Sequence, residues 1–384
     1  MKPTKFLPYQ RNAFSELIGQ WKENNHRAER ILNKYFRDHK KLGSRDRRLL
    51  SVLFYSYVKN FYFIDSIEWE SEEEQFEFLI VLDNTPVSEK LEILKQKSSD
   101  IEQHKLVSCP EWILNKWEEQ DADPIKTAIY QLGKSDVFLR LNGIKVSQGE
   151  INKLLEDEEL EISFDAVLNC YKSTSKKLSQ SAAYKNGLIE IQDYGSQRIG
   201  EFVEAKPNDL IIDACCGAGG KTLLLADKMK NTGKIWALDP RMKALEEASD
   251  RADRAGVENV EFFEIPENPE EVNFPFQCQK LLLDVPCTGS GTFSRNPDQK
   301  YKLTEVELLR LVDLQAKILR QYSKWVFPGG KLVYATCSTF QEENRKQIDR
   351  FISESDNWVL EEDQMIWPGP NHDGFYMARL IRKD

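Results

Sequence analysis

The first third of the chain combines apolar and basic residues with a helical period. Residues 10–65 contain no proline, and the pattern restarts at Ser44, which we expect to be the N-cap of a helix. The acidic stretch 68–77 predicts an exposed surface, and further helices are expected up to about Gly133. The pattern therefore predicts an all-helical domain over residues 1–130.

The pattern changes after this helical region. Residues 137–141, Val-Phe-Leu-Arg-Leu, are typical of a strand. Residues 148–160 predict an acidic helix, and the stretch from there to Ile191 is polar and rich in strand-forming residues. We interpret residues 131–194 as a small α+β region.

From about residue 195, short apolar runs alternate with helical segments. Runs that are apolar throughout indicate parallel strands covered by helices on both faces. Strands are expected at residues 210–213, 235–239, 281–284 and 331–335, and helices at 220–230, 241–255 and 304–326. The Pro-Gly-Gly sequence at 328–330 predicts a turn before the last strand. Residues 195–384 are thus predicted to form a doubly wound, Rossmann-like α/β domain, whose ligands bind beyond the carboxyl ends of the strands.

Composition narrows the class of protein. The 384 residues are 40% hydrophobic, enough for packed cores, and no apolar run reaches the roughly 18 residues of a membrane span. No apolar segment of a secretory signal follows the N-terminus, so a cytoplasmic protein is expected. Seven cysteines, an odd number, predict free thiols instead of a disulfide framework. Four histidines without metal-ligand spacing argue against a zinc site.

Charge is unevenly distributed along the chain. The net charge is −10, yet residues 1–50 hold 13 Lys and Arg against 5 Asp and Glu. A basic segment on an acidic body is typical of a contact with a polyanion. A solvated helical face would have the same composition, so charge alone leaves both interpretations open.

The first candidate site is a predicted strand that ends in an acid and continues into a glycine turn. Its sequence is Asp213-Ala-Cys215-Cys216-Gly217-Ala218-Gly219-Gly220-Lys221-Thr222. Small residues let a ligand approach the backbone, and the helix that follows offers free N–H groups. The spacing of the glycines departs from the Gly-x4-Gly-Lys pattern of a phosphate loop, which argues against binding of a nucleoside triphosphate.

Asp239 ends the next predicted strand. A carboxylate at this position typically accepts hydrogen bonds from ribose hydroxyls. Asp239 could instead be the N-cap of the helix at 241–255, but that interpretation does not explain its pairing with the glycine turn. The two features together predict an adenosine-type cofactor.

Two cysteines follow the ends of two further predicted strands. Cys287 lies in Asp284-Val-Pro-Cys-Thr, and Cys337 lies in Ala-Thr-Cys-Ser. Thiols act as nucleophiles and proton-handling groups. Together with an adenosine cofactor, they indicate methyl transfer to a pyrimidine carbon, because C5 of cytosine becomes nucleophilic only after a thiolate adds to C6. Small buried cysteines are instead expected at Cys109, Cys170 and Cys278.

These segments, in this order, resemble the Nop/Sun family of S-adenosylmethionine-dependent RNA cytosine-C5 methyltransferases. The resemblance covers about residues 190–384. Further matching segments are Gln192-Asp-Tyr-Gly-Ser-Gln197, Arg295-Asn-Pro-Asp298, Gln315, Pro328-Gly-Gly330, Glu343-Asn344 and Asp373-Gly-Phe375. Upstream, residues 110–112 and 138–142 resemble the family's RNA-binding region, and residues 45–57 are similar to the NusB-like helical domain of the bacterial small-subunit rRNA members.

The resemblance implies a role for each matching residue. Cys337 would be the nucleophile on C6, Cys287 would assist release of the enzyme, and Asp284 would hold the cytosine edge near N3. S-adenosylmethionine would be bound by Asp213, Cys215, Cys216, Gly217, Ala218, Gly219, Gly220, Lys221, Asp239, Glu264 and Asp284.

The chain departs from the family at three places. The family's Cys-Ala-Ala-Pro is Cys-Cys-Gly-Ala at 215–218, and Glu264 is the nearest substitute for an Asp that the family places near the adenine. Ser294 stands where the family has a second Arg before Asn-Pro-Asp, which is expected to alter contacts with RNA.

The expected partner is RNA, whose phosphates would be bound by the basic NusB-like region. Small-subunit rRNA is favoured over tRNA, no membrane is involved, and a monomer is expected. Two alternatives belong to other classes: an inactive ribosome-assembly factor that binds cofactor and RNA, and a methyltransferase of small molecules. Both cysteines argue against the first, and the two accessory regions argue against the second.

Overall fold

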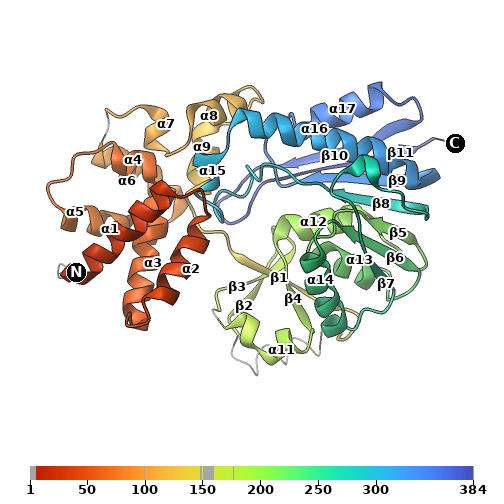
Figure 1. The fold of residues 1–384 in the computed structure, drawn as a ribbon, viewed down its shortest axis with the longest axis horizontal. Coiled ribbons are helices and arrows are strands. Elements are labelled where there is room, and N and C mark those ends of the chain that lie inside the picture. Colours follow the sequence, from red (N-terminus) through yellow and green to blue (C-terminus); the bar gives the residue numbers. More distant parts are fainter. Residues whose placement is uncertain (1–5, 99, 148, 150–159, 176, 384) are drawn as a thin grey trace. The chain divides into compact units, whose positions relative to one another are not determined.

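The structure is a computed structural model that describes residues 6–98, 100–147, 149, 160–175 and 177–383 (Figure 1). The acidic helix expected at 148–160 falls almost entirely outside the described residues. The chain divides into two compact units. The helical unit comprises residues 1–135, 290–304 and 368–373, and the sheet unit comprises residues 136–289, 305–367 and 374–384. The expected division into 1–130, 131–194 and 195–384 stays a prediction.

The helical unit confirms the helices expected in the first third of the chain. They are α1 (Pro8–Glu23), α2 (Ala28–Asp38), α3 (Ser44–Lys59), α4 (Phe61–Asp65), α5 (Glu72–Asn84), α6 (Val87–Lys97), α7 (Gln103–Leu106), α8 (Glu111–Glu118) and α9 (Pro124–Gln131), with α15 (Gln299–Lys302) from a later segment. Their apolar stripes form a core that includes Phe14, Leu17 and Trp21.

Two details of this unit differ from the sequence-based expectation. Ser44 is the first helical residue of α3 and not its cap, because the first helical bond runs from the Arg47 N–H to the carbonyl of Gly43. The acidic stretch 68–77 is only partly a surface, since Phe76 within it is buried in the core.

A small antiparallel sheet opens the sheet unit. Its strands are β1 (Val137–Leu141), β2 (Ile162–Asp165), β3 (Cys170–Ser173) and β4 (Ile189–Ile191), in the order β2-β3-β1-β4. The short helix α11 (Ala182–Lys185) and a 3₁₀ turn at Leu178–Gln180 pack beside it. The strand expected at 137–141 and the strand-forming character up to Ile191 are confirmed.

The main sheet has seven strands in the order β10-β11-β9-β8-β5-β6-β7. They are β5 (Leu210–Asp213), β6 (Lys234–Asp239), β7 (Val260–Glu264), β8 (Cys278–Asp284), β9 (Val326–Thr336), β10 (Trp358–Ile366) and β11 (Phe375–Arg382). Strands β5 to β9 are parallel. At one edge, β11 pairs antiparallel with β9, and β10 pairs antiparallel with β11.

Helices cover both faces of this sheet (Figure 1). Leu223 of α13 (Gly220–Lys228) and Ala252 of α14 (Met242–Ala255) pack into one core, beside Ile199 of α12 (Tyr194–Phe202). Helices α16 (Glu305–Tyr322) and α17 (Arg345–Ser353) pack into the core of the opposite face. The predicted doubly wound α/β fold is confirmed.

The expectation of a turn at residues 328–330 is wrong, because these residues lie within β9. The β8–β9 pairing passes from Val326 directly to Lys331 while β8 advances only from Cys278 to Lys280. The residues between Val326 and Lys331 therefore form a bulge, where a proline without an N–H interrupts no ladder bond. In the described part of the chain, no helix is long and apolar enough to cross a membrane.

Candidate active site

The carboxyl ends of β5, β6 and β8 meet around a cavity of about 400 Å³. Parallel strands place these ends at one edge of the sheet, which is the usual ligand position in this architecture. The cavity is lined by Ser196, Asp213, Cys215, Cys216, Gly217, Ala218, Gly220, Lys221, Asp239, Pro240, Arg241, Asp284, Val285 and Pro286. Nine of the eleven residues expected to bind the cofactor lie in this lining.

The glycine turn forms one wall of the cavity. Gly217 and Gly219 have φ of +54° and +78°, a conformation that favours glycine. A Cβ on Gly219 would also lie 2.9 Å from the Cβ of Ala248, so this glycine allows α13 to pack against α14. Gly219 does not line the cavity itself, and its role is to shape the turn.

Asp239 is nearly buried beside the turn. It accepts hydrogen bonds from the Gly217 N–H at 2.9 Å and from both the N–H and the guanidinium of Arg241. Burial would raise the pKa of this carboxyl, but the Arg241 hydrogen bonds hold it below its ordinary value. Helix α14 begins at Met242 after Arg241, so Asp239 fixes the turn and is not the N-cap. Sequence reasoning missed Arg241, which lies only two residues further on.

Glu264 is the second expected residue that does not line the cavity. It ends β7 directly beside Asp239 in the sheet register, and its side chain is exposed. Its proposed role near an adenine stays a prediction.

Asp213 carries a buried oxygen atom without a partner. Thr222 donates to Oδ2 at 2.7 Å, whereas Oδ1 is buried and accepts no hydrogen bond from the protein. Burial raises the pKa of this carboxyl to about 7. Buried polar atoms are normally satisfied, so this oxygen is suited to accept a hydrogen bond from a ligand in the cavity.

Lys221 connects the glycine turn to the end of β8. Its ammonium donates to Asp284 Oδ2 at 2.6 Å and to the Ser196 hydroxyl at 3.0 Å. Burial lowers the pKa of Lys221, but attraction to Asp284 outweighs it and leaves the pKa above its ordinary value. Lys221 is therefore charged, and it holds Asp284 in place. Sequence reasoning assigned both residues to the site but missed Ser196.

The two cysteines singled out from the sequence lie together. Their sulfur atoms are 3.2 Å apart, and both side chains are partly exposed. The hydrogen bond with Cys337, together with burial, raises the pKa of Cys287 well above its ordinary value. Cys287 is consequently held as a neutral thiol. Cys109, Cys170 and Cys278 are buried, as expected.

A buried carboxylate joins the two cysteine loops. Glu343 accepts from the Thr288 N–H at 2.9 Å and from the Gln315 amide at 2.8 Å, and the Thr288 hydroxyl lies 3.2 Å from that of Ser338. Gln315 also donates to the carbonyl of Pro286 at 2.9 Å. These bonds fix the residues beside both thiols. The sequence offered Gln315 and Glu343 only as parts of the resemblance, because nothing in their spacing indicates this role.

The Arg-Asn-Pro-Asp segment belongs to the helical unit. There Asp373 accepts a hydrogen bond from Ser294 at 2.5 Å and pairs with Arg295. Ser294 thus replaces the family's arginine with a short side chain that is bound to a carboxylate. Its expected effect on RNA contacts stays a prediction.

Part of the chain is similar to a known protein family. Residues 201–381 match the family of 16S rRNA methyltransferases RsmB/F. The resemblance seen in the sequence is therefore confirmed over residues 201–381. S-adenosylmethionine, the expected cofactor, is the cofactor of this family.

Similar proteins with curated names include ribosomal RNA small subunit methyltransferases B. The chain is 28% identical over 296 residues to the probable ribosomal RNA small subunit methyltransferase B of Synechocystis. This alignment covers 71% of this chain and 66% of the relative. It is 31% identical over 261 residues to the ribosomal RNA small subunit methyltransferase B of Shewanella oneidensis, covering 64% and 60%. The chain thus spans less than two thirds of the length of these relatives.

Solved structures show the same fold. The crystal structure of PH0851 aligns with a TM-score of 0.77 at 22% identity, covering 99% of this chain and 100% of that one. A methyltransferase homologue from Pyrococcus horikoshii aligns with a TM-score of 0.59 at 24% identity, covering 71% and 99%.

Proposed function

We propose that this protein is an RNA cytosine-C5 methyltransferase that uses S-adenosylmethionine. The observation that carries the proposal is the pair of thiols 3.2 Å apart, at the end of the sheet that also bears the cavity. The residues of the cavity suit the cofactor: the unpartnered Asp213 oxygen would accept from its ammonium group, and Asp239 from its ribose hydroxyls. When bound, S-adenosylmethionine supplies an electrophilic methyl group.

The side chains divide the chemistry between them. Cys337, as thiolate, adds to C6 of cytosine, and the electron pair of the C5–C6 double bond moves so that C5 becomes nucleophilic. Asp284, held by Lys221, would bind the ring edge at N3 and stabilise this redistribution of charge.

Release of the enzyme requires a proton to leave C5 after the methyl group has joined it. Cys287 lies beside Cys337 and is proposed to donate a hydrogen bond from its neutral thiol to the leaving sulfur of Cys337, while hydroxide or a buffer base accepts the C5 proton. The electrons of the broken C–H bond re-form the C5–C6 double bond and expel Cys337 as thiolate. The raised pKa of Cys287 keeps its thiol protonated and therefore able to donate this hydrogen bond.

The proposed substrate is small-subunit rRNA. The names of the relatives support this choice, as does the family matched by residues 201–381. A tRNA is the alternative substrate, and a cofactor-binding assembly factor without activity is the alternative function. The proposed localisation is the cytoplasm.

A methyl-transfer assay tests the proposal. The protein is incubated with radiolabelled S-adenosylmethionine and, separately, with unmodified small-subunit rRNA, tRNA and free cytidine. We expect label in rRNA alone, recovered as 5-methylcytosine after digestion. Label in tRNA would identify the alternative substrate, and binding of cofactor without any transfer would identify the assembly factor.

A further inference from the structure

A second cavity lies within the helical unit and is lined by four separate segments of it. Its volume is about 320 Å³, within the range of small-ligand sites. The segments are the end of α3, the end of α5 with the start of α6, the residues after α9, and residues 370–371. Nothing in the proposed methyl transfer uses this cavity.

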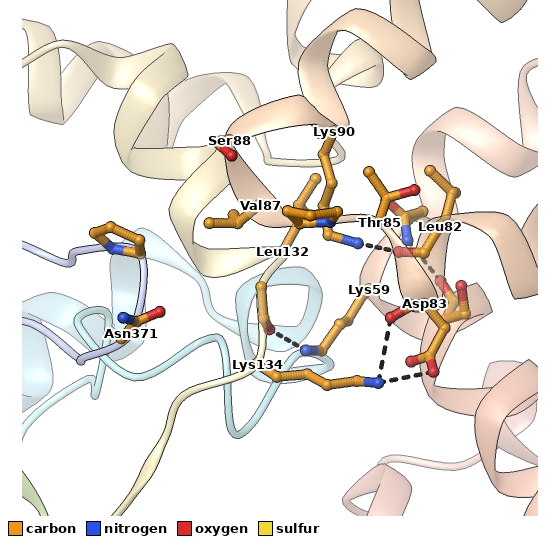
Figure 2. Close-up of a pocket in the computed structure, with 15 residues that line it drawn as sticks. Lys59, Leu82, Asp83, Thr85, Val87, Ser88, Lys90, Leu132, Lys134 and Asn371 are labelled. Atoms are coloured by element: carbon orange, nitrogen blue, oxygen red, sulfur yellow. Dashed lines mark hydrogen bonds and ion pairs between the residues drawn. The ribbon is translucent and has the colours of Figure 1, made fainter. Parts of the chain in front are cut away.

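Three lysines reach this cavity from different elements. Figure 2 shows the side chains of Lys59, Lys90 and Lys134 among the residues that line it. Lys59 donates to the carbonyl of Gly133, Lys90 donates to that of Leu82, and Lys134 pairs with Asp83 at 2.7 Å. Burial lowers the pKa of Lys59 to about 7 and that of Lys90 to about 8, and with Lys134 against one carboxylate the lining keeps an excess of positive charge near neutral pH.

The start of α6 adds further donors. Val87 and Ser88, its first residues, line the cavity, and N–H groups in the first turn of a helix have no intrahelical acceptor. The helix dipole adds partial positive charge at the same end. This combination of lysines with a helix N-terminus is typical of a site for a phosphate group.

Asn60 indicates that the ligand also carries a hydrogen-bond donor. It lines the cavity with 2% of its surface exposed. Its Nδ2 donates to the carbonyl of Ser56 at 2.8 Å, while Oδ1 is buried without a partner. A buried oxygen in this state is suited to accept a hydrogen bond from a hydroxyl or amino group of a ligand.

We propose that this cavity, the lysine pocket, binds a nucleoside phosphate. The phosphate contacts Lys59, Lys90, Lys134 and the start of α6, and a hydroxyl or base amino group donates to Asn60. The same chemistry is present in a nucleotide of an RNA strand and in a free nucleotide. Either source is compatible with the pocket, and competition with a short oligouridine distinguishes between them.

Occupation of the pocket would reach the segment that follows the Cys287 motif. The carbonyl of Lys59 accepts hydrogen bonds from Lys300 at 2.9 Å and from Tyr301 at 3.0 Å. Both residues lie in segment 290–304, within the same helical unit. The backbone of Lys59 thus connects the lysine pocket to this segment.

The protonation of Lys59 provides a readout that a purely structural lysine would lack. Burial and the charges of Lys90, Lys134 and Lys300 lower the pKa of Lys59 to about 7, against the opposing effect of Asp83. A bound phosphate would raise this pKa again, so the protein should take up a proton on binding.

Calorimetry on the full chain, without S-adenosylmethionine, tests the proposal with uridine 5′-monophosphate and with uridine. Uridine avoids the cytosine site, so failure here would leave the methyltransferase proposal untouched. We expect the monophosphate to bind at least about tenfold more tightly than the nucleoside. At slightly alkaline pH, the heat of binding should depend on the ionisation enthalpy of the buffer. This dependence should decrease in Lys59→Met, where Lys90, whose pKa burial lowers to about 8, is the lysine that can still take up a proton.

Two surface variants make the result independent of folding. Lys134 is 65% exposed at the pocket, and Lys95 is exposed on α6 outside it. Lys134→Gln should weaken binding about fivefold or more, whereas Lys95→Gln should change it less than about twofold. Absence of phosphate-dependent binding at millimolar ligand, or equal effects of the two substitutions, would overturn the proposal.

A short oligouridine identifies the source of the nucleotide. If it displaces the monophosphate and is itself weakened by Lys134→Gln, the lysine pocket is part of the path of RNA. If it binds without displacing the monophosphate, the pocket serves a free nucleotide.

Discussion

The sulfur atoms of Cys287 and Cys337 lie 3.2 Å apart, although 50 positions separate the residues in the sequence. The sheet explains this proximity, because β8 and β9 are adjacent and parallel, with Asp284 opposite Ala335. Each cysteine follows its strand within a few residues, so both loops begin at the same edge. The closeness of the thiols makes their division of roles a question for experiment.

The two cysteine variants should fail in different ways. Cys337→Ala should form no bond to RNA and show no turnover. Cys287→Ala should still add to the base and methylate it, but elimination should stall, so a protein–RNA adduct should accumulate with S-adenosylmethionine. A denaturing gel with labelled RNA measures this. The opposite pattern would exchange the two roles, and activity in both variants would exclude thiol chemistry.

Glu343 should be required to position both cysteine loops. Glu343→Ala leaves the donors of Thr288 and Gln315 without their acceptor, at a cost of about 2–4 kcal/mol in the free energy of unfolding. We expect kcat to fall at least about tenfold while the affinity for S-adenosylmethionine stays unchanged. Glu354→Ala, which removes an exposed carboxylate, is the control. A fall in cofactor affinity equal to that in kcat would contradict a positioning role.

Asp239→Ala should weaken cofactor binding about tenfold or more, because a charged hydrogen-bond acceptor is worth roughly 1.5–3 kcal/mol. The substitution also releases Gly217 and Arg241 from their shared acceptor. Glu264 ends the adjacent strand and is expected near the adenine. Glu264→Ala therefore tests the adenine-side role separately from the ribose-side role of Asp239. Calorimetry with S-adenosylmethionine measures both, and wild-type affinity in Asp239→Ala would remove this assignment.

Asp213 should make the stability of the protein depend on pH. Its pKa is raised to about 7 by burial, whereas the unfolded carboxyl titrates near 4. The native state therefore keeps a proton that the unfolded state releases, so the contribution to stability is present below about pH 4 and is lost as the pH rises to about 7. Asp213→Asn should remove this contribution to the dependence of the free energy of unfolding on pH. Urea denaturation at several pH values measures it, and identical slopes in both proteins would contradict the prediction.

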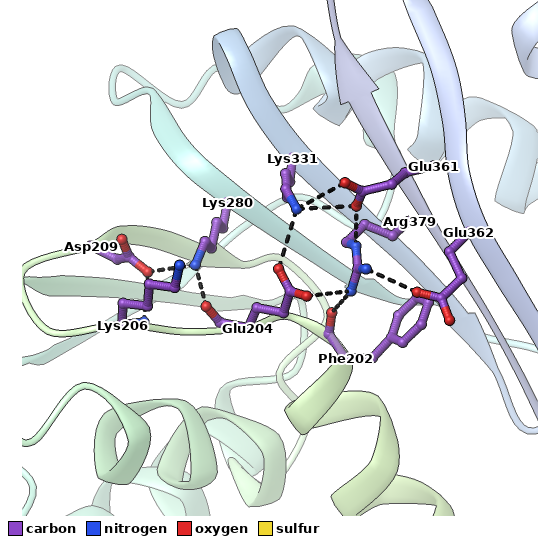
Figure 3. Close-up of polar contacts among 9 residues, drawn as sticks. All are labelled: Phe202, Glu204, Lys206, Asp209, Lys280, Lys331, Glu361, Glu362 and Arg379. Carbon is purple, nitrogen blue, oxygen red and sulfur yellow. Dashed lines mark hydrogen bonds and ion pairs between the residues drawn. The ribbon is translucent and has the colours of Figure 1, made fainter.

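Arg379 should be a stabilising residue of the sheet unit. Figure 3 shows its guanidinium among Glu204, Glu361 and Glu362, and it donates to the carbonyl of Phe202 at 2.9 Å. Its side chain is only 8% exposed, so Arg379→Met should cost about 1–3 kcal/mol.

An exposed arginine of the same unit serves as the control for this substitution. Arg320 pairs with Glu354 and is 53% exposed. Arg320→Met should cost less than about 1 kcal/mol, because exposed ion pairs contribute little. Chemical denaturation of both variants measures the difference, and equal costs would contradict the role of burial.

The basic helices should supply part of the affinity for RNA. Deleting residues 1–50 would remove buried Leu17 and Trp21 and unfold the unit, so substitution of exposed charges is the sharper test. Replacing Lys34, Arg37 and Lys41 together by Gln should reduce the slope of log affinity against log salt by about 0.7–0.9 for each phosphate that these side chains neutralise. An unchanged slope would place the phosphate-binding residues elsewhere.

The sequence by itself determined the local elements and the chemistry-bearing segments. The apolar runs at 210–213 and 235–239 predicted buried strands, which the structure confirms, and the glycine turn followed from the residues of 213–222. Cys287 and Cys337 were recognisable because each follows such a run. These features depend on neighbours along the chain, which the sequence contains.

Tertiary structure decided which of these residues meet. Lys221 holds Asp284, Glu343 joins two loops, and Gly219 shapes a turn without lining the cavity, because strand order and helix packing bring distant segments together. The strands β10 and β11 and the bulge at 327–330 also escaped the sequence pattern. The lysine pocket is the clearest case: no local pattern connects Lys59, Lys90 and Lys134, and only the packing of separate helices places their charges around one cavity.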